Sequence, residues 1–194
     1  KILIAGCGTG YQIHQAQRYN NSQITAIDLS SASLAYAQRK ITEMNIPNVE
    51  LIQMDILELH LLKKKFDIIE CGGVLHHMND PSLGLKSLSD SLKIKGFMKL
   101  GLYSELARKN VVKAREYLKT ENKANFNKKN MNSLRKGIMN RDFPELISLT
   151  KTHDFYTSSM FRDLCFHVHE HRFKIFEIEK ILNFLNLKFL GFVI

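Results

Sequence analysis

Residues 2–10 read ILIAGCGTG, and this stretch decides the fold of the chain. Four apolar residues run directly into three glycines at alternate positions, a pattern typical of a buried strand that ends in a tight turn. Because glycine has no Cβ, the backbone of such a turn can approach a ligand closely. Residues 11–19 have helical spacing. The turn is therefore expected to end at a helix whose free N–H groups face the ligand.

The rest of the first half alternates between apolar runs and helical patterns. Apolar runs predict strands over 23–27, 49–53, 66–71 and 97–103, while helical spacing predicts helices over 32–44, 81–92 and 176–185. Ser30 and Asp80 stand where N-caps are expected. Alternation of this kind predicts an α/β fold, a doubly wound and mostly parallel sheet with helices on both faces. Ligands of such sheets bind at the carboxyl ends of the strands, near the switch in strand order.

The glycine spacing differs from that of a dinucleotide-binding turn. That fingerprint is G-x-G-x-x-G, and Tyr11 stands where its third glycine would be. The spacing here is G-x-G-x-G, formed by Gly6, Gly8 and Gly10. Asp28 then ends the second apolar run and Asp55 follows the third.

With these motifs in this order, the first half of the chain resembles the class I S-adenosylmethionine-dependent methyltransferases. The resemblance implies a Rossmann-like sheet, S-adenosylmethionine as cofactor and S-adenosylhomocysteine as product. The family usually has an acidic residue two positions before the first glycine, where this chain has Ile4. Because of this departure, the resemblance does not imply how the chain holds the methionine end of the cofactor.

The resemblance also implies which residues touch the cofactor. Asp28 would accept the two ribose hydroxyls, although the same position serves NAD, and the alternative is a simple turn aspartate. Asp55 would face the adenine amino group while Ile56 packs on the ring, the alternative for Asp55 being a helix cap. The full cofactor-binding prediction comprises Gly6, Cys7, Gly8, Gly10, Asp28, Leu29, Asp55, Ile56, Cys71 and Gly72.

Several polar residues outside this set are candidates for catalysis. A general base is needed only if the acceptor carries a proton, as a hydroxyl or an amine does. His76 and His77 resemble a histidine pair that borders the active site in family members acting on small molecules, and adjacent residues cannot both face the site. The catalytic prediction comprises His76, Tyr156, His167 and Glu170.

The histidines near residue 170 raise a separate possibility. If 167–171 is a strand, His167, His169 and His171 point to one face and could together ligate zinc. One strand face rarely brings three imidazoles onto one ion, so we expect no metal here. We expect instead that one or two of these residues line the acceptor pocket or lie at the surface.

The segment 104–150 interrupts the alternation and is expected to be a helical insert, either a lid over the acceptor or an elaboration without contact to it. Between Glu105 and Asp142 it holds eleven Lys or Arg residues against four Asp or Glu. Such a basic segment can bind nucleic acid, but aromatic residues that could stack bases are sparse. A solvated helical surface is the favoured interpretation.

Residues 101–108 and 154–171 resemble, more specifically, bacterial methyltransferase domains that often follow tetratricopeptide repeats. That group suggests a protein or protein-tethered acceptor. It also fits our expectation that residues 1–194 form one methyltransferase domain that is a piece of a longer chain.

Composition limits the remaining choices. The 194 residues carry a formal charge of +9, and no apolar stretch approaches the length of a membrane span. The three cysteines show neither disulfide nor zinc spacing, which favours a cytoplasmic location. We therefore predict a methyltransferase whose acceptor is a small molecule or a protein. The alternatives are a module that binds the cofactor without transfer and an RNA methyltransferase that uses the basic segment. The sequence does not predict the oligomeric state.

Overall fold

A computed structural model describes residues 1–121, 127–167 and 169–193 of the chain. The chain divides into two compact units. The first unit comprises Lys1–Leu102 and Ile175–Ile194, and the second unit comprises Tyr103–Lys174. Each unit is described by itself below.

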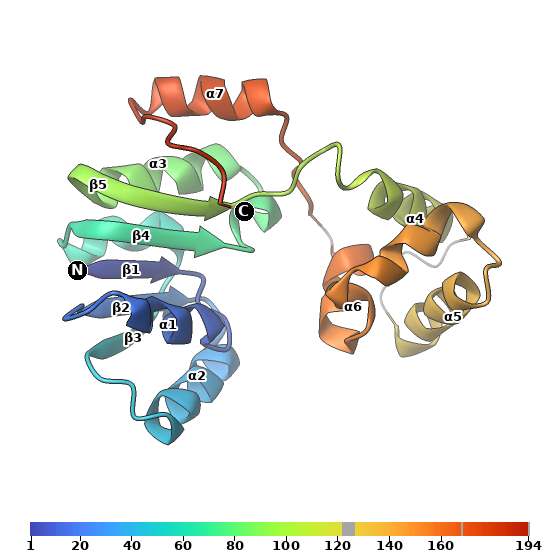
Figure 1. Cartoon of the computed structure of the whole chain (residues 1–194), viewed down its shortest axis with the longest axis horizontal. Coiled ribbons are helices and arrows are strands. Elements are labelled where there is room, and N and C mark those ends of the chain that lie inside the picture. The colour runs from blue at the N-terminus through green and yellow to red at the C-terminus, as the bar shows by residue number, and fades with distance from the viewer. Residues whose placement is uncertain (122–126, 168, 194) are drawn as a thin grey trace. The chain divides into compact units, whose positions relative to one another are not determined.

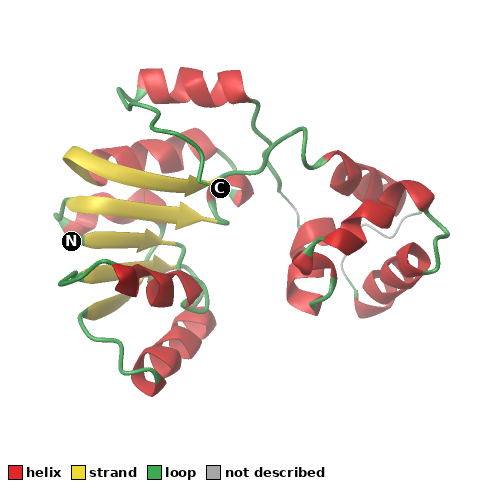
Figure 2. Cartoon of the chain, in the orientation of Figure 1, coloured by secondary structure: helices red, strands yellow, loops and turns green. Residues whose placement is uncertain are grey.

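The first unit is built on a parallel five-stranded sheet (Figures 1 and 2). Its strands are β1 (Ile2–Ala5), β2 (Ile24–Asp28), β3 (Val49–Gln53), β4 (Phe66–Gly72) and β5 (Leu92–Gly101). The spatial order is β3-β2-β1-β4-β5, and all four neighbouring pairs are parallel. The strand order reverses between β1 and β4, so the ligand site is expected beside the ends of these two strands.

Helices cover both faces of this sheet, which confirms the predicted doubly wound fold. They are α1 (Tyr11–Gln15), η1 (Ala16–Arg18), α2 (Ser31–Glu43), η2 (Ile56–Leu62), η3 (Leu75–His77), α3 (Pro81–Ser91) and α7 (Ile175–Phe184). Alternate residues of β1 point to opposite faces, so Ile2 and Ile4 share a core cluster with α1 and α2. Leu3 and Ala5 pack with η2 and α3 on the other face.

Two predicted N-caps are present. The Ser30 hydroxyl accepts a hydrogen bond from the backbone N–H of Ser33 at 3.2 Å, and the Asp80 carboxylate accepts one from Ser82 at 2.9 Å. Caps of this kind stabilise a helix by about 1 kcal/mol each. They fix the points at which the chain leaves β2 and the loop after β4.

The second unit is helical in its described residues. It consists of α4 (Lys109–Thr120), α5 (Lys128–Met139), η4 (Pro144–Lys151), η5 (His153–Phe155) and α6 (Ser158–Phe166). These elements share one apolar core that includes Leu118, Leu134 and Phe161. The helical insert predicted over 104–150 lies within this unit, which continues to Lys174.

The chain enters and leaves the second unit at neighbouring points. Ser104 and Phe173 form an isolated parallel bridge. The N–H of Phe173 donates to the carbonyl of Tyr103 at 2.8 Å, and the N–H of Glu105 donates to the carbonyl of Phe173 at 3.2 Å. The unit is therefore closed at its base by backbone hydrogen bonds.

Three local predictions were wrong. The fifth strand begins at Leu92 rather than at residue 97. Its first half is an exposed part of the sheet edge, where Lys93 and Lys95 flank the exposed Ile94 and leave no apolar run in the sequence. Residues 167 and 169–171, treated above as a strand in the zinc hypothesis, lie outside the strands of the sheet, and so do residues 187–193, whose apolar run also suggests a strand. An apolar run forms a strand only where a neighbouring strand offers hydrogen bonds. None of the described helices has the length and apolar character that crossing a bilayer requires.

Candidate functional site

The glycine turn after β1 has the backbone conformation that the sequence implied. Gly6, Gly8 and Gly10 have φ angles of +75°, +52° and +96°, all in the left-handed region that favours glycine. A Cβ on Gly6 would lie 2.1 Å from Cγ2 of Val74, whereas a Cβ on Gly8 would meet nothing within 4 Å. The turn therefore packs against the loop after β4 at Gly6 and stays open at Gly8.

Asp28 connects this turn to the end of β2. One carboxylate oxygen accepts from the N–H of Gly8 at 2.8 Å, and the other accepts from the N–H of Ser30 at 2.8 Å. Each oxygen retains capacity for a further donor. The carboxylate is half-buried and lines a pocket, so it can accept hydrogen bonds from a ligand while it holds the glycine turn.

Asp55 has both of the roles that the sequence allowed. Its side chain caps η2 by accepting from the N–H of Leu57 at 2.9 Å, and it also lines the pocket beside Ile56. Since a carboxylate has about four acceptor positions, the cap leaves room for a ligand donor.

The pocket at the carboxyl ends of the strands has a volume of about 570 Å³. Its described lining residues all belong to the first unit. The lining combines apolar walls with a few polar groups, as is usual for small-molecule sites. The lining residues are Gly6, Asp28, Leu29, Met54, Asp55, Ile56, Leu57, Val74, His77, Met78, Asn79, Asp80 and Leu83.

Half of the predicted cofactor-binding residues line this pocket: Gly6, Asp28, Leu29, Asp55 and Ile56. The other half, at the glycine turn and the end of β4, are Cys7, Gly8, Gly10, Cys71 and Gly72. They are not among its lining residues.

Two of the predicted cofactor-binding residues that do not line the pocket are cysteines. Their side chains lie in the apolar clusters on the two faces of the sheet. Cys7 packs in the cluster with α1 and α2, and Cys71 packs in the cluster with η2 and α3. Burial, together with the charge of Asp28, raises the pKa of Cys7 to about 12, and burial raises the pKa of Cys71 to about 12. Both thiols are therefore protonated and act as small apolar residues near neutral pH.

The sequence did not single out seven of the lining residues as cofactor or catalytic positions: Met54, Leu57, Val74, Met78, Asn79, Asp80 and Leu83. Most of them lie between the end of β4 and the first turn of α3. The signal that could have found them is position, because loops at the carboxyl ends of parallel strands form the ligand site.

The adjacent histidines face different surroundings, as expected. His76 is 1% exposed, whereas His77 lines the pocket. Their rings meet edge to face with centroids 4.3 Å apart. His77 is thus the imidazole of this pair that reaches the pocket.

The remaining catalytic candidates lie in the second unit. Tyr156 is exposed, and its hydroxyl donates to the carbonyl of Thr150 at 2.8 Å. The Glu170 side chain is 0% exposed and forms ion pairs with Arg108, with Arg115 at 3.5 Å and with Arg172 at 3.6 Å. Through these ion pairs the Glu170 carboxylate fastens the chain after α6 to α4.

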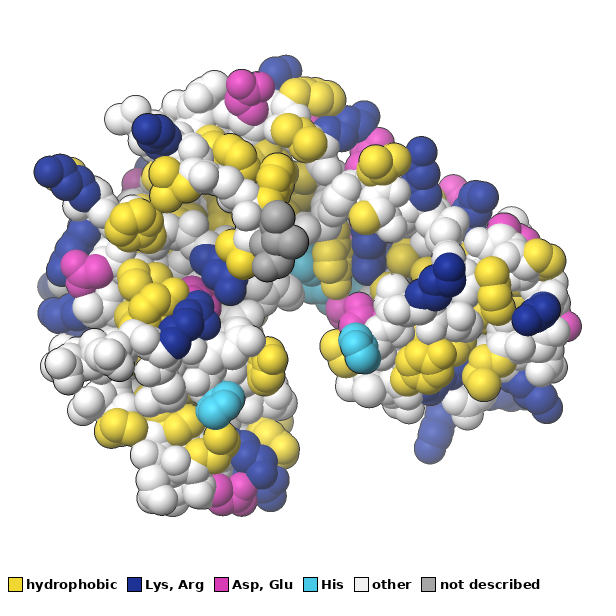
Figure 3. Space-filling view, in the orientation of Figure 1, with side chains coloured by type: hydrophobic (Ala, Val, Ile, Leu, Met, Phe, Trp, Pro, Cys, Tyr) yellow, Lys and Arg dark blue, Asp and Glu magenta, His cyan; other side chains and the backbone are white. Residues whose placement is uncertain are grey.

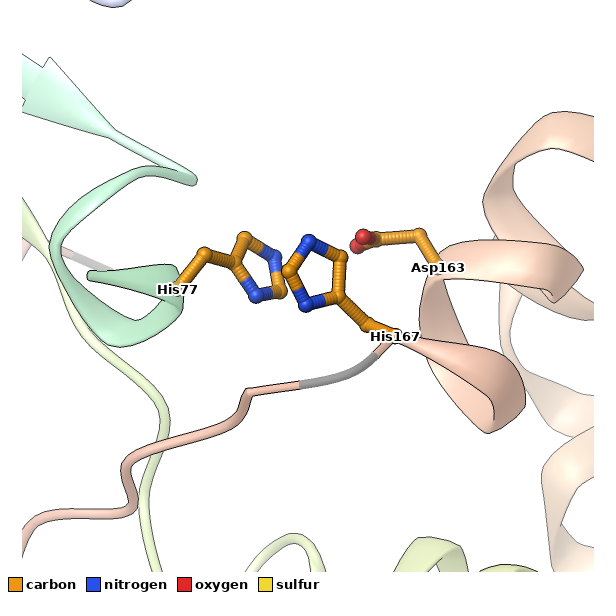
Figure 4. A group of neighbouring side chains, drawn as sticks. All are labelled: His77, Asp163 and His167. Atoms are coloured by element: carbon orange, nitrogen blue, oxygen red, sulfur yellow. The ribbon is translucent and has the colours of Figure 1, made fainter. Parts of the chain in front are cut away.

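His167 ends α6, and its Nδ1 lies 2.7 Å from the carbonyl oxygen of His169. Asp163 lies one helical turn earlier, and its carboxylate lies within 4.8 Å of a ring nitrogen of His167 (Figure 4). Since the described residues 167 and 169–171 are not part of a strand, the shared strand face supposed for a zinc site of His167, His169 and His171 is not formed. His77 in the same figure belongs to the first unit.

The basic segment is less available than its composition suggested. Arg108 and Arg115 are engaged with Glu170, and the guanidinium of Arg135 lies 5.6 Å from the ring centroid of Phe155. Lys123 falls outside the described residues. On the face of the second unit that Figure 3 shows, Lys and Arg are interspersed with apolar and uncharged groups rather than gathered into one patch.

Comparison with known proteins finds one family model that matches the first half of the chain. Residues 2–96 match the Methyltransf_25 family, described as "Methyltransferase domain". The chain is 36% identical over 118 residues to an uncharacterized protein of Synechococcus, covering 60% of this chain and 28% of that protein. It is 33% identical over 99 residues to malonyl-[acyl-carrier protein] O-methyltransferase of Bacillus cereus, covering 50% of this chain and 35% of that enzyme. The matches therefore span about a third of these relatives or less.

Solved structures show the same fold. The chain superposes on PKMT2 from Rickettsia typhi in complex with AdoHcy with a TM-score of 0.78 and 22% identity, covering 98% of this chain and 39% of that one. It superposes on YcgJ from Bacillus subtilis with a TM-score of 0.59 and 18% identity, covering 95% of this chain and 60% of that one. At these identities the likeness concerns the fold alone.

Proposed function

We propose that this chain, whose residues 2–96 match the family described as a methyltransferase domain, is a class I methyltransferase that transfers a methyl group from S-adenosylmethionine to a small-molecule or protein acceptor. The observation that carries the proposal is the link between the glycine turn and Asp28. The N–H of Gly8 donates to this carboxylate at 2.8 Å, at the edge of the pocket.

The residues present fit the cofactor. Asp28 would accept the ribose hydroxyls with the lone pairs that Gly8 and Ser30 leave open. Asp55 and Ile56 would hold the adenine, since both line the pocket at the end of β3. The open space at Gly8, where a Cβ would meet no atom within 4 Å, leaves room for the ligand to lie against the turn.

The bound cofactor supplies a methyl group on a sulfonium, a good leaving group whose positive charge is lost as the methyl moves. The chain has to hold the acceptor in line with that methyl group and to exclude water. Orientation of this kind can supply an effective molarity of about 10⁵ M or more. Met78 and Leu83 exclude water as apolar lining, while His77 and Asn79 offer polar groups to the acceptor.

If the acceptor is a hydroxyl or an amine, a proton has to leave it. We assign this role first to His77, because it lines the pocket, whereas its neighbour His76 is buried. Tyr156 and His167 of the second unit remain proposed proton acceptors. Glu170 is proposed instead to hold the second unit together, since its carboxylate is engaged with guanidinium groups.

We propose that the second unit, with the insert 104–150, recognises the acceptor. The relatives that match the first half carry different names, an O-methyltransferase in Bacillus cereus and N-methyltransferase 4 in Papaver somniferum. The shared half therefore does not determine the acceptor, and the segment outside the family match is the place where specificity can differ.

The resemblance of residues 101–108 and 154–171 to domains associated with tetratricopeptide repeats supports a protein or protein-tethered acceptor. A cytoplasmic location is part of the same proposal. It is supported by three free cysteines, all buried.

The competing function is a module that binds the cofactor without transferring the methyl group, and Ile4 in place of the family's acidic residue is its support. Calorimetry with S-adenosylhomocysteine, and with NAD as comparator, tests the cofactor. We expect binding of the first and none of the second. Formation of S-adenosylhomocysteine from S-adenosylmethionine, measured with small-molecule and protein fractions as acceptors, then separates an enzyme from a module. Tight binding of NAD would contradict the proposal.

A further inference from the structure

The order of the lining residues along the sheet gives the path that the cofactor of the proposed function would take. Met54 and Asp55 follow β3, Asp28 and Leu29 end or follow β2, Gly6 follows β1 and Val74 follows β4. Because the strands lie side by side in the order β3-β2-β1-β4, these lining residues form a row along the carboxyl edge of the sheet. With adenine at β3 and ribose at β2, the amino-acid tail points to the gap between β1 and β4.

Gln12 bridges that gap. It is the second residue of α1, which follows β1, and its Nε2 donates to the carbonyl of Gly72 at the end of β4 at 3.2 Å. Gly72 lacks the Cβ that would lie 2.9 Å from this nitrogen. The amide therefore lies against the end of β4 because position 72 is glycine.

The other atom of this amide is not used by the chain. Oε1 of Gln12 is buried, and within the described part of the chain no hydrogen-bond donor reaches it. Rotating the amide by 180° would set Oε1 against the Gly72 carbonyl, two acceptors facing each other, so the orientation is determined. An acceptor left without a donor in a buried position destabilises the folded chain, because it has lost its hydrogen bond to water. A ligand that brings a donor to this atom would remove this destabilisation.

The acidic side chain on the neighbouring strand is already engaged. Glu70 lies opposite Ile4, the position where the family has its acid, in the register of β1 and β4. Glu70 is 3% exposed and is held by Arg18 and by the hydroxyl of Tyr19 at 3.0 Å. Glu70 thus secures the end of η1. Beside the gap between β1 and β4, Oε1 of Gln12 is a buried acceptor to which no described residue donates.

We infer that Oε1 of Gln12 accepts a hydrogen bond from the α-ammonium group of the bound cofactor, in place of the acid missing at Ile4. This inference rests on the proposed function. It deepens that function, because it makes Gln12 the residue that distinguishes a nucleoside with an amino-acid tail from one without it. In this arrangement the amino-acid tail of the ligand extends beyond the lining residues of the pocket to the amide of Gln12 at the end of β4.

Binding of two ligands to the full chain tests the inference. S-Adenosylhomocysteine carries the amino-acid tail, and 5′-methylthioadenosine has the same nucleoside and sulfur without it. Gln12→Met keeps the length of the side chain and removes the amide. We expect calorimetry to show about tenfold or more weaker binding of S-adenosylhomocysteine, the loss of one charge-assisted hydrogen bond, with binding of 5′-methylthioadenosine unchanged. Gln15→Met, on the same helix, is the matched control and should change neither affinity.

The outcomes separate this inference from the proposed function. Equal binding of S-adenosylhomocysteine by the wild type and Gln12→Met overturns the inference and leaves the proposed function standing. Equal weakening of both ligands also overturns it, because the residue would then only shape the turn. If the wild type binds no S-adenosylhomocysteine, the proposed function fails and the inference fails with it. A thermal unfolding curve for each variant verifies that the fold is retained.

Discussion

Asp28 shows at the residue scale how one side chain can serve both fold and ligand. It accepts from Gly8 and Ser30 at 2.8 Å each and faces the pocket. We expect Asp28→Ala to reduce the affinity for S-adenosylhomocysteine by at least about tenfold, because hydrogen bonds to a charged group contribute about 1.5–3 kcal/mol each. Calorimetry measures the affinity, and circular dichroism shows whether the fold remains.

Asp67→Ala is the control for this change. Asp67 is exposed, and its hydrogen bonds with Lys93 lower the pKa of its carboxyl to about 2. It lies outside the pocket lining, so its removal should leave the affinity unchanged. Unchanged affinity in Asp28→Ala itself would count against the placement of the ribose.

The cysteines give a prediction that depends on pH. Burial raises the pKa values of Cys7, Cys71 and Cys165 from 9.0 to about 12. The unfolded chain ionises its thiols above pH 9 while the folded chain does not, so this contribution to stability is complete below pH 9 and decreases as the pH rises toward 12. We expect a thiol reagent at pH 8 to react slowly with the native protein and rapidly in denaturant. If the reagent reacted rapidly with any of the three cysteines in the native protein, that cysteine would not be buried.

At the element scale, the connection between β1 and α1 is packed against the loop after β4. Gly6→Ala would place a Cβ 2.1 Å from Val74, whereas Gly8→Ala meets open space. Both substitutions put alanine at positive φ, a cost of about 1–2 kcal/mol. We expect Gly6→Ala to lower the free energy of unfolding further than Gly8→Ala does, by denaturant titration. In the double variant Gly6→Ala with Val74→Ala, the loss of unfolding free energy should be partly recovered, because the clash with the valine side chain is removed. If Gly6→Ala and Gly8→Ala lower the free energy of unfolding equally, Gly6 is not packed against Val74.

Glu170 joins the chain after α6 to α4 inside the second unit. Its buried carboxylate is paired with Arg108, Arg115 and Arg172. We expect Glu170→Gln to destabilise this unit by about 3–5 kcal/mol, because it leaves buried guanidinium groups without their partner. Thermal unfolding measures the effect. Glu116→Gln, at an exposed position of α4 in the same unit, serves as comparison, and a similar small shift for both variants would argue against a structural role of Glu170.

At the scale of the whole molecule, the binding pocket and the second unit are separable along the chain. Tyr103 and Phe173 are joined by a backbone hydrogen bond of 2.8 Å, so the ends of the excised segment lie close together. We expect a chain in which a short Gly/Ser linker replaces residues 103–174 to fold and to bind S-adenosylhomocysteine with the affinity of the full chain. The affinity should be unchanged because every described lining residue of the pocket lies in the first unit. Calorimetry and a cooperative unfolding curve measure this, and loss of binding in a folded variant would show that the second unit contributes to the cofactor site.

The sequence by itself determined the alternation of strands and helices, the glycine turn, the N-caps at Ser30 and Asp80, and the positions of Asp28 and Asp55 at strand ends. These features depend on interactions within a few residues, namely side-chain periodicity, capping and positive φ at glycine. The early start of β5 was missed because its first half is an exposed edge with alternating lysines.

Only the tertiary structure decided which of two adjacent histidines reaches the pocket, that Glu170 is held by guanidinium groups, and that Gln12 meets Gly72 sixty residues away. Such contacts depend on which strands become neighbours and on how closely two backbones approach. No local pattern encodes them. Packing between distant segments chooses among orientations that the sequence leaves equally open.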